Sequence, residues 1–307
     1  MSGNPIISVS NITKSFGEVR ALDEVELKVY GGIFGIIGPN GAGKTTLLKI
    51  LLGLLSPDSG TAEVLGYDIS QDSLRIRRVI GVLHERPSYP NRMTVQTYLN
   101  RVEGLYGKRG NTEKVLKLVK LSNACDRRIG ALSAGMLQRL GIAQALVGDP
   151  VLIFLDEPTS NLDVDGRDDV ARMILDIYNE TGVSFVIASH ILSDLERVCH
   201  GVAIIRHGKV IEAGGVQETI QRYTTRRFRV VTSNPKGLVG KLELIKGILE
   251  CNISGANTIT IRMESENLSG ISSKIHEIGE KLGIRVYAIE HADTLEDAFR
   301  ELVRDEK

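Results

Sequence analysis

The chain has 307 residues, 42% of them hydrophobic, and its 38 basic and 38 acidic side chains give a formal net charge of zero. This length and composition suffice to bury a full core, either in one large domain or in two domains of unequal size, and we favour two. The balanced charge argues against a dedicated nucleic-acid-binding protein, which would carry a broad basic surface.

Neither a disulfide framework nor a membrane span is predicted. The cysteines, Cys125, Cys199 and Cys251, are far apart and show no paired spacing, which favours a reducing compartment such as the cytosol. The first residues lack the basic and apolar segments of a signal peptide, and no apolar run reaches the roughly 18 residues that span a bilayer. If the protein serves a membrane, we expect another chain to cross it.

Strands and helices are predicted to alternate over the first two-thirds of the chain. Residues 7–10 and 25–29 are expected to be strands, the second with alternating apolar and charged side chains and therefore one buried face. A helix is expected over residues 45–55, and a hairpin over residues 202–212 closes this part. Buried parallel strands, covered by helices on both faces, are predicted from short apolar runs at residues 33–37, 79–83, 151–155 and 185–188.

Two further regions complete the predicted organisation. Residues from about 92 to 147 have a mostly helical pattern and are predicted to form a helical lobe inserted in the first domain, which we assign to residues 1–222. Residues 223–307 are predicted to form a smaller α+β domain with the strand-helix-strand-strand-helix-strand order of a ferredoxin-like fold. The strands and helices of this order are expected at residues 228–231, 236–243, 245–252, 257–263, 268–282 and 284–290.

The second domain ends in a predicted helix over residues 295–303, which Thr294 caps with Asp297 three residues on. The basic cluster of Arg226, Arg227 and Arg229 is interpreted as a solvated strand face, and contact with anionic lipid is the alternative. No catalytic constellation is recognisable in this domain. A packing or dimer-stabilising role is therefore favoured over a ligand sensor.

A glycine-rich loop lies between the strand at 33–37 and the helix at 45–55. Its glycines let the backbone curl so that amide hydrogens point at phosphate oxygens, beside the positive end of the helix. Lys44 is expected to place a charge on the phosphates, Thr45 to offer its hydroxyl to Mg²⁺ and Thr46 to reach the α-phosphate. A turn without a ligand is the alternative. The predicted nucleotide-binding residues of the loop are Gly38, Pro39, Asn40, Gly41, Ala42, Gly43, Lys44, Thr45 and Thr46.

Two carboxylates end the strand predicted at residues 151–155, at the sheet edge where the phosphate loop must lie. We expect Asp156 to hold the metal through water, and Glu157 to orient and deprotonate the attacking water. An exposed acidic turn is the alternative. His190 follows another predicted strand at the same edge and is expected to donate to the γ-phosphate, although a lone histidine is usually structural.

Ser133 precedes an amphipathic helix, and a serine in this position is typical of a helix cap. The unobstructed amide of Gly135 adds a second possibility. This helix start would be an anion site without a lysine of its own, suited to a γ-phosphate that another subunit presents. Both roles are compatible.

The phosphate loop, residues 132–136 and the acidic strand, in this order, resemble the ATPase subunit of ATP-binding-cassette (ABC) transporters over nearly all of residues 6–215. The resemblance implies an α/β P-loop NTPase cassette with a mixed core sheet, an N-terminal antiparallel β part and an inserted helical lobe. It also implies that Asp163 lies in a dimer-contact loop and that His190 is the switch histidine. Phe16 stands where the family stacks an aromatic on adenine, although by itself it would be assigned to the core.

The family resemblance has two departures. Ala134 stands where the family often has glycine, a small change that should be tolerated. Glu85 stands where most members carry a glutamine that contacts the metal and signals to the membrane subunit. An ionised glutamate still accepts from Mg²⁺-bound water but cannot donate a hydrogen bond. Glutamate here, together with the C-terminal module, resembles the drug, antibiotic and ABC-2-type exporter branch.

The resemblance implies a homodimer in which ATP and Mg²⁺ are trapped between the phosphate loop of one copy and Ser133 and Gly135 of the other. We expect ATP hydrolysis in both sites, and a peripheral location at the cytoplasmic face of the membrane through a permease subunit. Residues 86–98 are expected to form the groove that moves the permease helices. No nucleic-acid partner is expected.

Two other functions remain open from the sequence. One is a soluble ABC ATPase that acts on nucleic acid or ribosomes, against which the single cassette and its compact helical lobe argue. The other is a regulatory nucleotide-binding module without turnover, against which the presence of both Glu157 and His190 argues.

Overall fold

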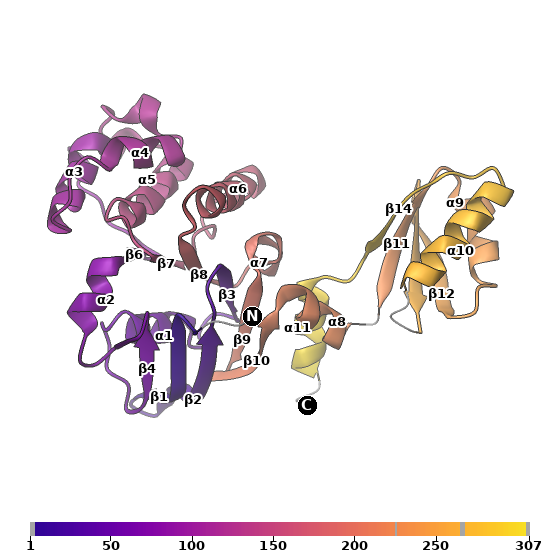
Figure 1. The fold of residues 1–307 in the computed structure, drawn as a ribbon, viewed down its shortest axis with the longest axis horizontal. Helices are drawn as coiled ribbons and strands as arrows, with labels where there is room; N and C mark the ends of the chain where they lie inside the picture. Colours follow the sequence, from indigo (N-terminus) through magenta and orange to yellow (C-terminus); the bar gives the residue numbers. More distant parts are fainter. Residues whose placement is uncertain (1–3, 225, 265–267, 305–307) are drawn as a thin grey trace. The chain divides into compact units, whose positions relative to one another are not determined.

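The computed structural model describes residues 4–224, 226–264 and 268–304, and it divides into two compact units, Met1–Val216 and Gln217–Lys307. Figure 1 shows the elements of both units. None of the described helices is long and apolar enough to cross a lipid bilayer.

The first unit contains an antiparallel four-stranded sheet in the order β2-β1-β4-β5. Its second strand has the predicted alternation, because Val25, Leu27 and Val29 are buried while Glu26 and Lys28 are exposed. The antiparallel β part implied by the family resemblance is therefore confirmed. The strands are β1 (Ile7–Phe16), β2 (Val19–Val29), β4 (Ser59–Val64) and β5 (Tyr67–Asp68).

A six-stranded sheet forms the core of the first unit, in the order β10-β9-β3-β8-β7-β6. Its strands pair in parallel except for the hairpin of β9 and β10, so the predicted mixed sheet is confirmed. Every residue of β3 and β7 is buried, as expected for strands covered on both faces. The strands are β3 (Ile33–Ile37), β6 (Ile80–Leu83), β7 (Leu152–Asp156), β8 (Ser184–Ser189), β9 (Gly201–Arg206) and β10 (Lys209–Gly215).

Helices flank this core sheet and include the predicted lobe, which is inserted between β6 and β7 (Figure 1). Gly81 of β6 fixes the approach of α5, since a Cβ atom at Gly81 would stand 2.0 Å from the carbonyl oxygen of Ala145. The lobe is thereby anchored to the sheet. The helices of this unit are α1 (Lys44–Leu51), α2 (Ser73–Val79), α3 (Val95–Leu105), α4 (Thr112–Leu118), α5 (Ala134–Leu146), α6 (Val164–Thr181) and α7 (Leu192–Val198).

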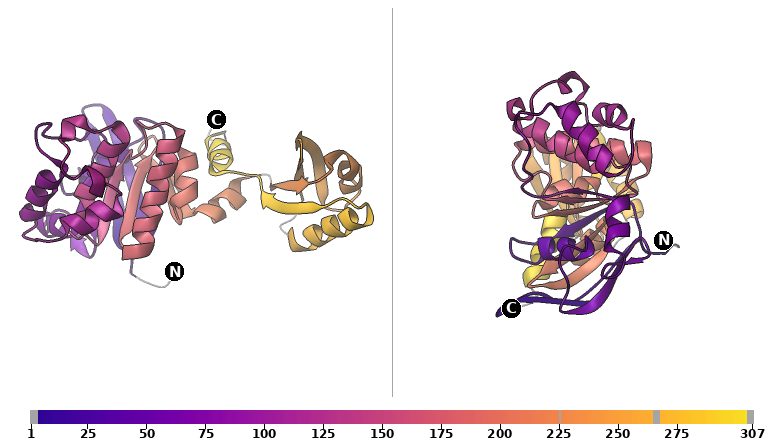
Figure 2. Two further views of the ribbon diagram at one scale, coloured as in Figure 1. Left: turned by 90° about the horizontal axis from the view of Figure 1, so that it is seen from above. Right: turned by 90° about the vertical axis from the view of Figure 1, so that its left-hand side faces the viewer.

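The second unit contains an antiparallel sheet in the order β12-β13-β11-β14, as expected for the predicted ferredoxin-like series. Two helices, α9 and α10, cover the same face of this sheet (Figures 1 and 2) and bury Phe228, Leu238 and Ile275 in one core. Helix α8 (Val216–Tyr223) precedes the series. Its other elements are β11 (Arg227–Thr232), α9 (Pro235–Leu242), β12 (Ile248–Gly255), β13 (Thr258–Met263), α10 (Leu268–Lys281), β14 (Val286–His291) and α11 (Leu295–Arg304).

The predicted cap of the last helix is present. The Thr294 hydroxyl accepts from the Asp297 amide at 3.2 Å, and the Asp297 carboxylate accepts from the Thr294 amide at 3.1 Å. Arg227 is only partly solvated, because its side chain is 40% exposed and its Nε donates to the buried Asp293 at 2.8 Å. Arg229 is exposed, as predicted.

Candidate functional site

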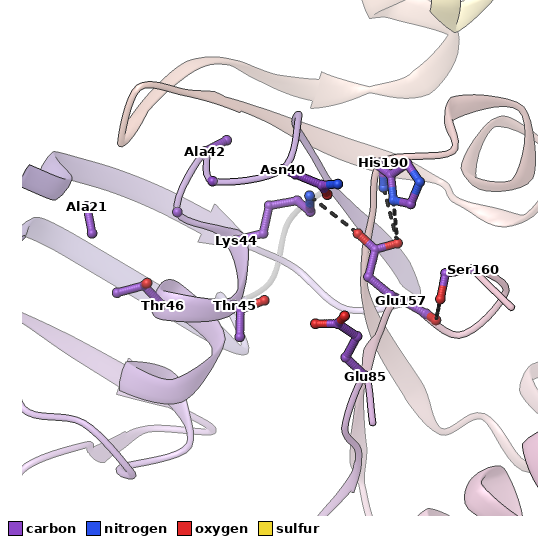
Figure 3. Close-up of a pocket in the computed structure, with 12 residues that line it drawn as sticks. Ala21, Asn40, Ala42, Lys44, Thr45, Thr46, Glu85, Glu157, Ser160 and His190 are labelled. Atoms are coloured by element: carbon purple, nitrogen blue, oxygen red, sulfur yellow. Dashed lines mark hydrogen bonds and ion pairs between the residues drawn. The ribbon is translucent and has the colours of Figure 1, made fainter. Parts of the chain in front are cut away.

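The carboxyl ends of β3, β8 and β7 meet at one edge of the core sheet, because these strands are parallel neighbours. A pocket of about 340 Å³ lies at this edge, and Figure 3 shows the side chains around it. Most of the phosphate-loop residues predicted from the sequence line it. The lining residues are Ala21, Asn40, Gly41, Ala42, Gly43, Lys44, Thr45, Thr46, Glu85, Glu157, Ser160 and His190.

The glycine-rich loop requires glycine for its backbone path. Gly43 has a φ angle of 110°, and a Cβ atom there would stand 2.5 Å from the carbonyl oxygen of Ala21. Gly43 is also the N-cap residue of α1, and no side chain caps the first amides of this helix. Those amides therefore face the pocket as free donors, in a position suited to an anion.

Lys44 is buried, and its ammonium group contacts three oxygen atoms. Its Nζ donates to the carbonyl of Gly38 at 2.7 Å and to that of Pro39 at 3.3 Å, and it lies 3.4 Å from Oε1 of Glu157. Gly38 and Pro39 thus hold the lysine rather than line the pocket. A buried ammonium needs such partners, because an unpaired charge away from water is very costly.

Glu157 adopts a backbone conformation that is uncommon for a residue with a side chain, with a φ angle of 51° directly after β7. Its amide still donates to the carbonyl of Ala188 on β8 at 2.8 Å, so the turn is pinned to the sheet. This turn brings the carboxylate between Lys44 and His190 (Figure 3). Oε2 of Glu157 lies 2.8 Å from Nδ1 of His190 and accepts from the His190 amide at 3.4 Å.

Asp156 and Glu85 provide further carboxylates beside the hydroxyl of Thr45. Oγ1 of Thr45 lies 3.4 Å from Oδ1 of Asp156, and Glu85 points its carboxylate toward the side of the pocket where Thr45 lies (Figure 3). Burial raises the pKa of Asp156. The hydrogen bond from Thr45 opposes this shift, while the charges of Glu157 and Glu85 add to it.

This set of oxygen donors suits Mg²⁺, a hard cation that binds through one or two carboxylates plus phosphate oxygens and water. A cation here would also offset the repulsion between the carboxylates. Within the described part of the chain, no cluster of three or more His, Cys, Asp or Glu side chains is arranged to hold a metal by itself. The donors therefore fit an ion that arrives with a phosphate ligand.

Ser133 and Gly135 lie outside this pocket. The Ser133 hydroxyl accepts from the amide of Met136 at 3.3 Å, so the predicted helix cap is confirmed. At Gly135 a Cβ atom would meet nothing within 4 Å, so the space beside its Cα atom is open. Both residues line a separate cavity of about 480 Å³ that also includes the basic side chains of Lys120, Arg127 and Arg139.

Two other predicted residues also lie apart from the pocket. Asp163 caps α6, with its Oδ1 atom accepting from the amide of Gly166 at 2.9 Å. Phe16 is 52% exposed, so the alternative that it is a core residue is wrong, and Lys14 Nζ lies 5.7 Å from the centre of its ring. Its position at the end of a strand beside a hairpin turn leaves the ring without a covering element.

Sequence reasoning missed Ala21 and Ser160 as pocket residues. Ser160 has a detectable signal, because it stands three residues after Glu157, and its hydroxyl donates to the Glu157 carbonyl at 3.1 Å. Ala21 carries no such signal. It reaches the pocket only because β2 passes beside the phosphate loop, so closely that a Cβ atom at Gly43 would clash with the Ala21 carbonyl oxygen.

Comparisons with known proteins agree with this geometry. A family model described as ABC transporter matches residues 22–160. The bacitracin transport ATP-binding protein BcrA of Bacillus licheniformis is 37% identical over 211 residues, which is 67% of this chain and 69% of that protein. The uncharacterized ABC transporter ATP-binding protein YxlF of Bacillus subtilis is 37% identical over 82% of this chain and 85% of its own length. The Nod factor export ATP-binding protein I of a Rhizobium species is 28% identical over 96% of each chain.

Solved structures show the same fold. A nucleotide-free ATP-binding cassette from an ABC transporter superposes with a TM-score of 0.64 and 26% identity, over 71% of this chain and 94% of that one. A dimeric bacterial ABC transporter cassette superposes with a TM-score of 0.60 and 25% identity, over 68% of this chain and 98% of that one. With the phosphate loop, the acidic strand and the histidine at one sheet edge, the chain belongs to the ATP-binding subunits of ABC transporters, a family of ATPases.

Proposed function

We propose that this protein hydrolyses ATP at the pocket beside the phosphate loop, as the energy-supplying subunit of a membrane exporter. The observation that carries this proposal is the position of the Glu157 carboxylate between Lys44 and His190, at the sheet edge where the loop amides face the pocket. We assign the ATP-binding domain to residues 1–222, with its helical lobe at about 92–147, and the accessory domain to residues 223–307.

The phosphates of ATP would bind to the amides of the loop and to Lys44. The lysine would exchange its contact with Glu157 for phosphate oxygens, which frees the carboxylate for a second task. Thr46 would reach the α-phosphate. The exposed ring of Phe16 would offer its face to adenine.

The metal ion would be held by Thr45 directly and by Asp156 and Glu85 through water. When bound, Mg²⁺ supplies positive charge that stabilises the β- and γ-phosphate oxygens. Glu157 would accept a proton from the attacking water, and His190 would donate a hydrogen bond to the γ-phosphate. His190 also fixes the orientation of Glu157, since a single hydrogen bond of 2.8 Å joins their side chains.

A second copy would complete the site, because Ser133 and Gly135 line a different cavity from the phosphate loop of their own chain. Head-to-tail pairing would bring these two residues to the γ-phosphate on the partner, with Asp163 in the dimer contact. The dimeric cassette among the solved structures supports this assembly. Because Glu157 is present in each copy, both sites of a homodimer would hydrolyse ATP.

The names of two relatives support coupling to transport, since one is a bacitracin transport protein and another a Nod factor export protein. A permease encoded separately would hold this subunit at the cytoplasmic face of the membrane, with residues 86–98 in the contact. No observation on this chain favours the alternative of a nucleic-acid or ribosomal ATPase.

Copurification tests the transport part of the proposal. The full chain is tagged and carries Glu157→Gln, which is expected to hold ATP without hydrolysing it, and it is extracted gently from membranes of cells that produce it. Mass spectrometry should identify a polytopic membrane protein that is missing when the untagged chain is processed in parallel. Recovery with ribosomes or nucleic acid alone would contradict the proposal.

A further inference from the structure

A small cavity adjoins the turn that carries Glu157, because the next two residues, Pro158 and Thr159, line it. Its walls are mostly apolar and come from α6, α7 and β8. The space open to the centre of a water-sized sphere is about 10 Å³, which is about the room that one water molecule requires. The lining residues are Pro158, Thr159, Ala171, Ile174, Ile187, Ser189, Asp194, Leu195 and Val198.

Two buried side-chain atoms, one in each of two residues that line this cavity, lack a hydrogen-bond partner in the described part of the chain. Oγ1 of Thr159 and Oδ2 of Asp194 are both fully shielded from solvent and accept or donate no hydrogen bond within the described protein. The two residues are 4% and 8% exposed. Leaving a hydroxyl and a carboxylate oxygen unsatisfied in apolar surroundings is costly, and such groups are almost always paired with protein or with ordered water.

We propose that one buried water molecule bridges Thr159 and Asp194, and that this bridge positions the Glu157–His190 pair. The water would donate to Oδ2 of Asp194 and accept from the Thr159 hydroxyl, which satisfies both groups at once. Thr159 and Asp194 are positioning residues, because neither one lines the phosphate pocket.

The proposed water bridge joins the segment that follows Glu157 to the segment that follows His190, and these two segments set how the two side chains are aligned. Thr159 stands two residues after Glu157, and Asp194 lies in the first turn of α7, four residues after His190. Ser189 connects the cavity to the pair directly, since its hydroxyl accepts from the Ile191 amide at 3.0 Å and donates to Oε2 of Glu157 at 3.5 Å. The turn at Glu157 has a strained φ of 51°, so its shape depends on such surrounding contacts.

The water itself is tested by a crystal structure of the full chain at a resolution that shows ordered water. We expect a water molecule within hydrogen-bond distance of both Oγ1 of Thr159 and Oδ2 of Asp194. A dry cavity, or a direct hydrogen bond between the two side chains, would overturn the proposal. This readout does not depend on hydrolysis.

The positioning role rests on the proposed hydrolysis and is tested by Thr159→Val, which keeps the shape but removes the hydroxyl. Thr112→Val is the matched control, because the Thr112 hydroxyl is equally buried and lies 3.0 Å from a Glu103 carboxylate oxygen in the helical lobe. Turnover is measured per bound nucleotide, so that unfolded protein does not count. We expect kcat to fall about tenfold in Thr159→Val with KM for ATP unchanged, and to stay at the wild-type value in Thr112→Val.

A second variant separates positioning from a loss of stability. Thr159→Ser retains the hydroxyl while removing a methyl group, so it should recover most of the lost kcat even though it leaves a small void. Equal kcat in Thr159→Val and wild type, or failure of Thr159→Ser to recover it, would overturn the positioning role. A wild-type chain that binds ATP without hydrolysing it would instead contradict the proposed function, and the crystallographic test of the water would still stand.

Discussion

Nδ1 of His190 lies 2.8 Å from Oε2 of Glu157, and the other oxygen of the same carboxylate lies 3.4 Å from Nζ of Lys44. Lys44 follows β3 and the phosphate loop, Glu157 follows β7 and His190 follows β8. The three residues are therefore carried by three different strands of the core sheet. The parallel order of β3, β8 and β7 brings them together, because it places their carboxyl ends side by side.

Replacing His190 with glutamine should slow ATP hydrolysis by about a hundredfold while leaving ATP affinity nearly unchanged. The variant loses the side chain that holds Glu157 and donates to the γ-phosphate, whereas the loop amides and Lys44 are untouched. Phosphate release under saturating ATP measures the effect. His276→Gln serves as the control, because His276 is exposed on α10 of the second unit. A His190→Gln variant that hydrolyses ATP as fast as this control would rule out the role.

Lys44→Met should weaken ATP binding at least tenfold, as judged by titration calorimetry. The substitution removes the ammonium group that contacts the phosphates and also leaves the Glu157 carboxylate without its 3.4 Å partner. Lys49→Met on the same helix is the matched control, since Lys49 is exposed and faces away from the pocket. Similar affinities for the two variants would show that the phosphates do not depend on Lys44.

Ser133→Asp separates the two roles of that residue. Aspartate caps a helix as well as serine does, so we expect the free energy of unfolding to change by less than about 0.5 kcal/mol. The added charge would repel a γ-phosphate, and ATP-dependent dimerisation should be lost. Light scattering with Mg²⁺ and ATP, in the Glu157→Gln background, reports the dimer.

The control for that experiment is Asn234→Asp, the same kind of cap substitution at α9 in the second unit, where the Asn234 side chain accepts from Gly237 at 3.1 Å. It should dimerise normally. If Ser133→Asp also dimerises normally, then Ser133 is a helix cap and nothing more.

The reactivity of Cys251 should depend steeply on pH. Burial, followed by the nearby charge of Glu243, raises the pKa of this thiol to about 11. The thiolate is the reactive form, so roughly one molecule in a thousand is reactive at pH 8, and the alkylation rate should rise about tenfold per pH unit up to the pKa. Peptide mapping after timed iodoacetamide treatment measures this rate. Labelling at pH 8 as fast as in a short unfolded cysteine peptide would contradict the burial.

Continuous apolar runs made the core strands predictable. β3 was predicted at its observed bounds and β7 within one residue, because strands buried on both faces require apolar side chains throughout. β4 was not predicted, since only Ala62 and Val64 of its six residues are buried and its pattern is mostly polar. The residue at the start of the run predicted at 79–83 belongs to α2, so that strand begins one residue later.

The site was predictable where a motif fixes both sequence and geometry. The lining residues of the phosphate loop and the neighbouring carboxylates fall in this class. Phe16 shows where such prediction fails. Whether a single aromatic side chain is buried depends on the elements that pack over it, and the Phe16 ring is 52% exposed. The cavity at Thr159 and Asp194 could not be predicted either, because it depends on how the side chains of α6, β8 and α7 pack against one another.

The most direct test of the account is phosphate release by wild-type protein and by Glu157→Gln, measured at equal occupancy with Mg²⁺ and ATP. The account predicts that the wild type hydrolyses ATP, and that the variant binds ATP with similar affinity but releases phosphate about a thousandfold more slowly. Glu157→Gln hydrolysing ATP at the wild-type rate would show that the carboxylate between Lys44 and His190 is not the group that activates water.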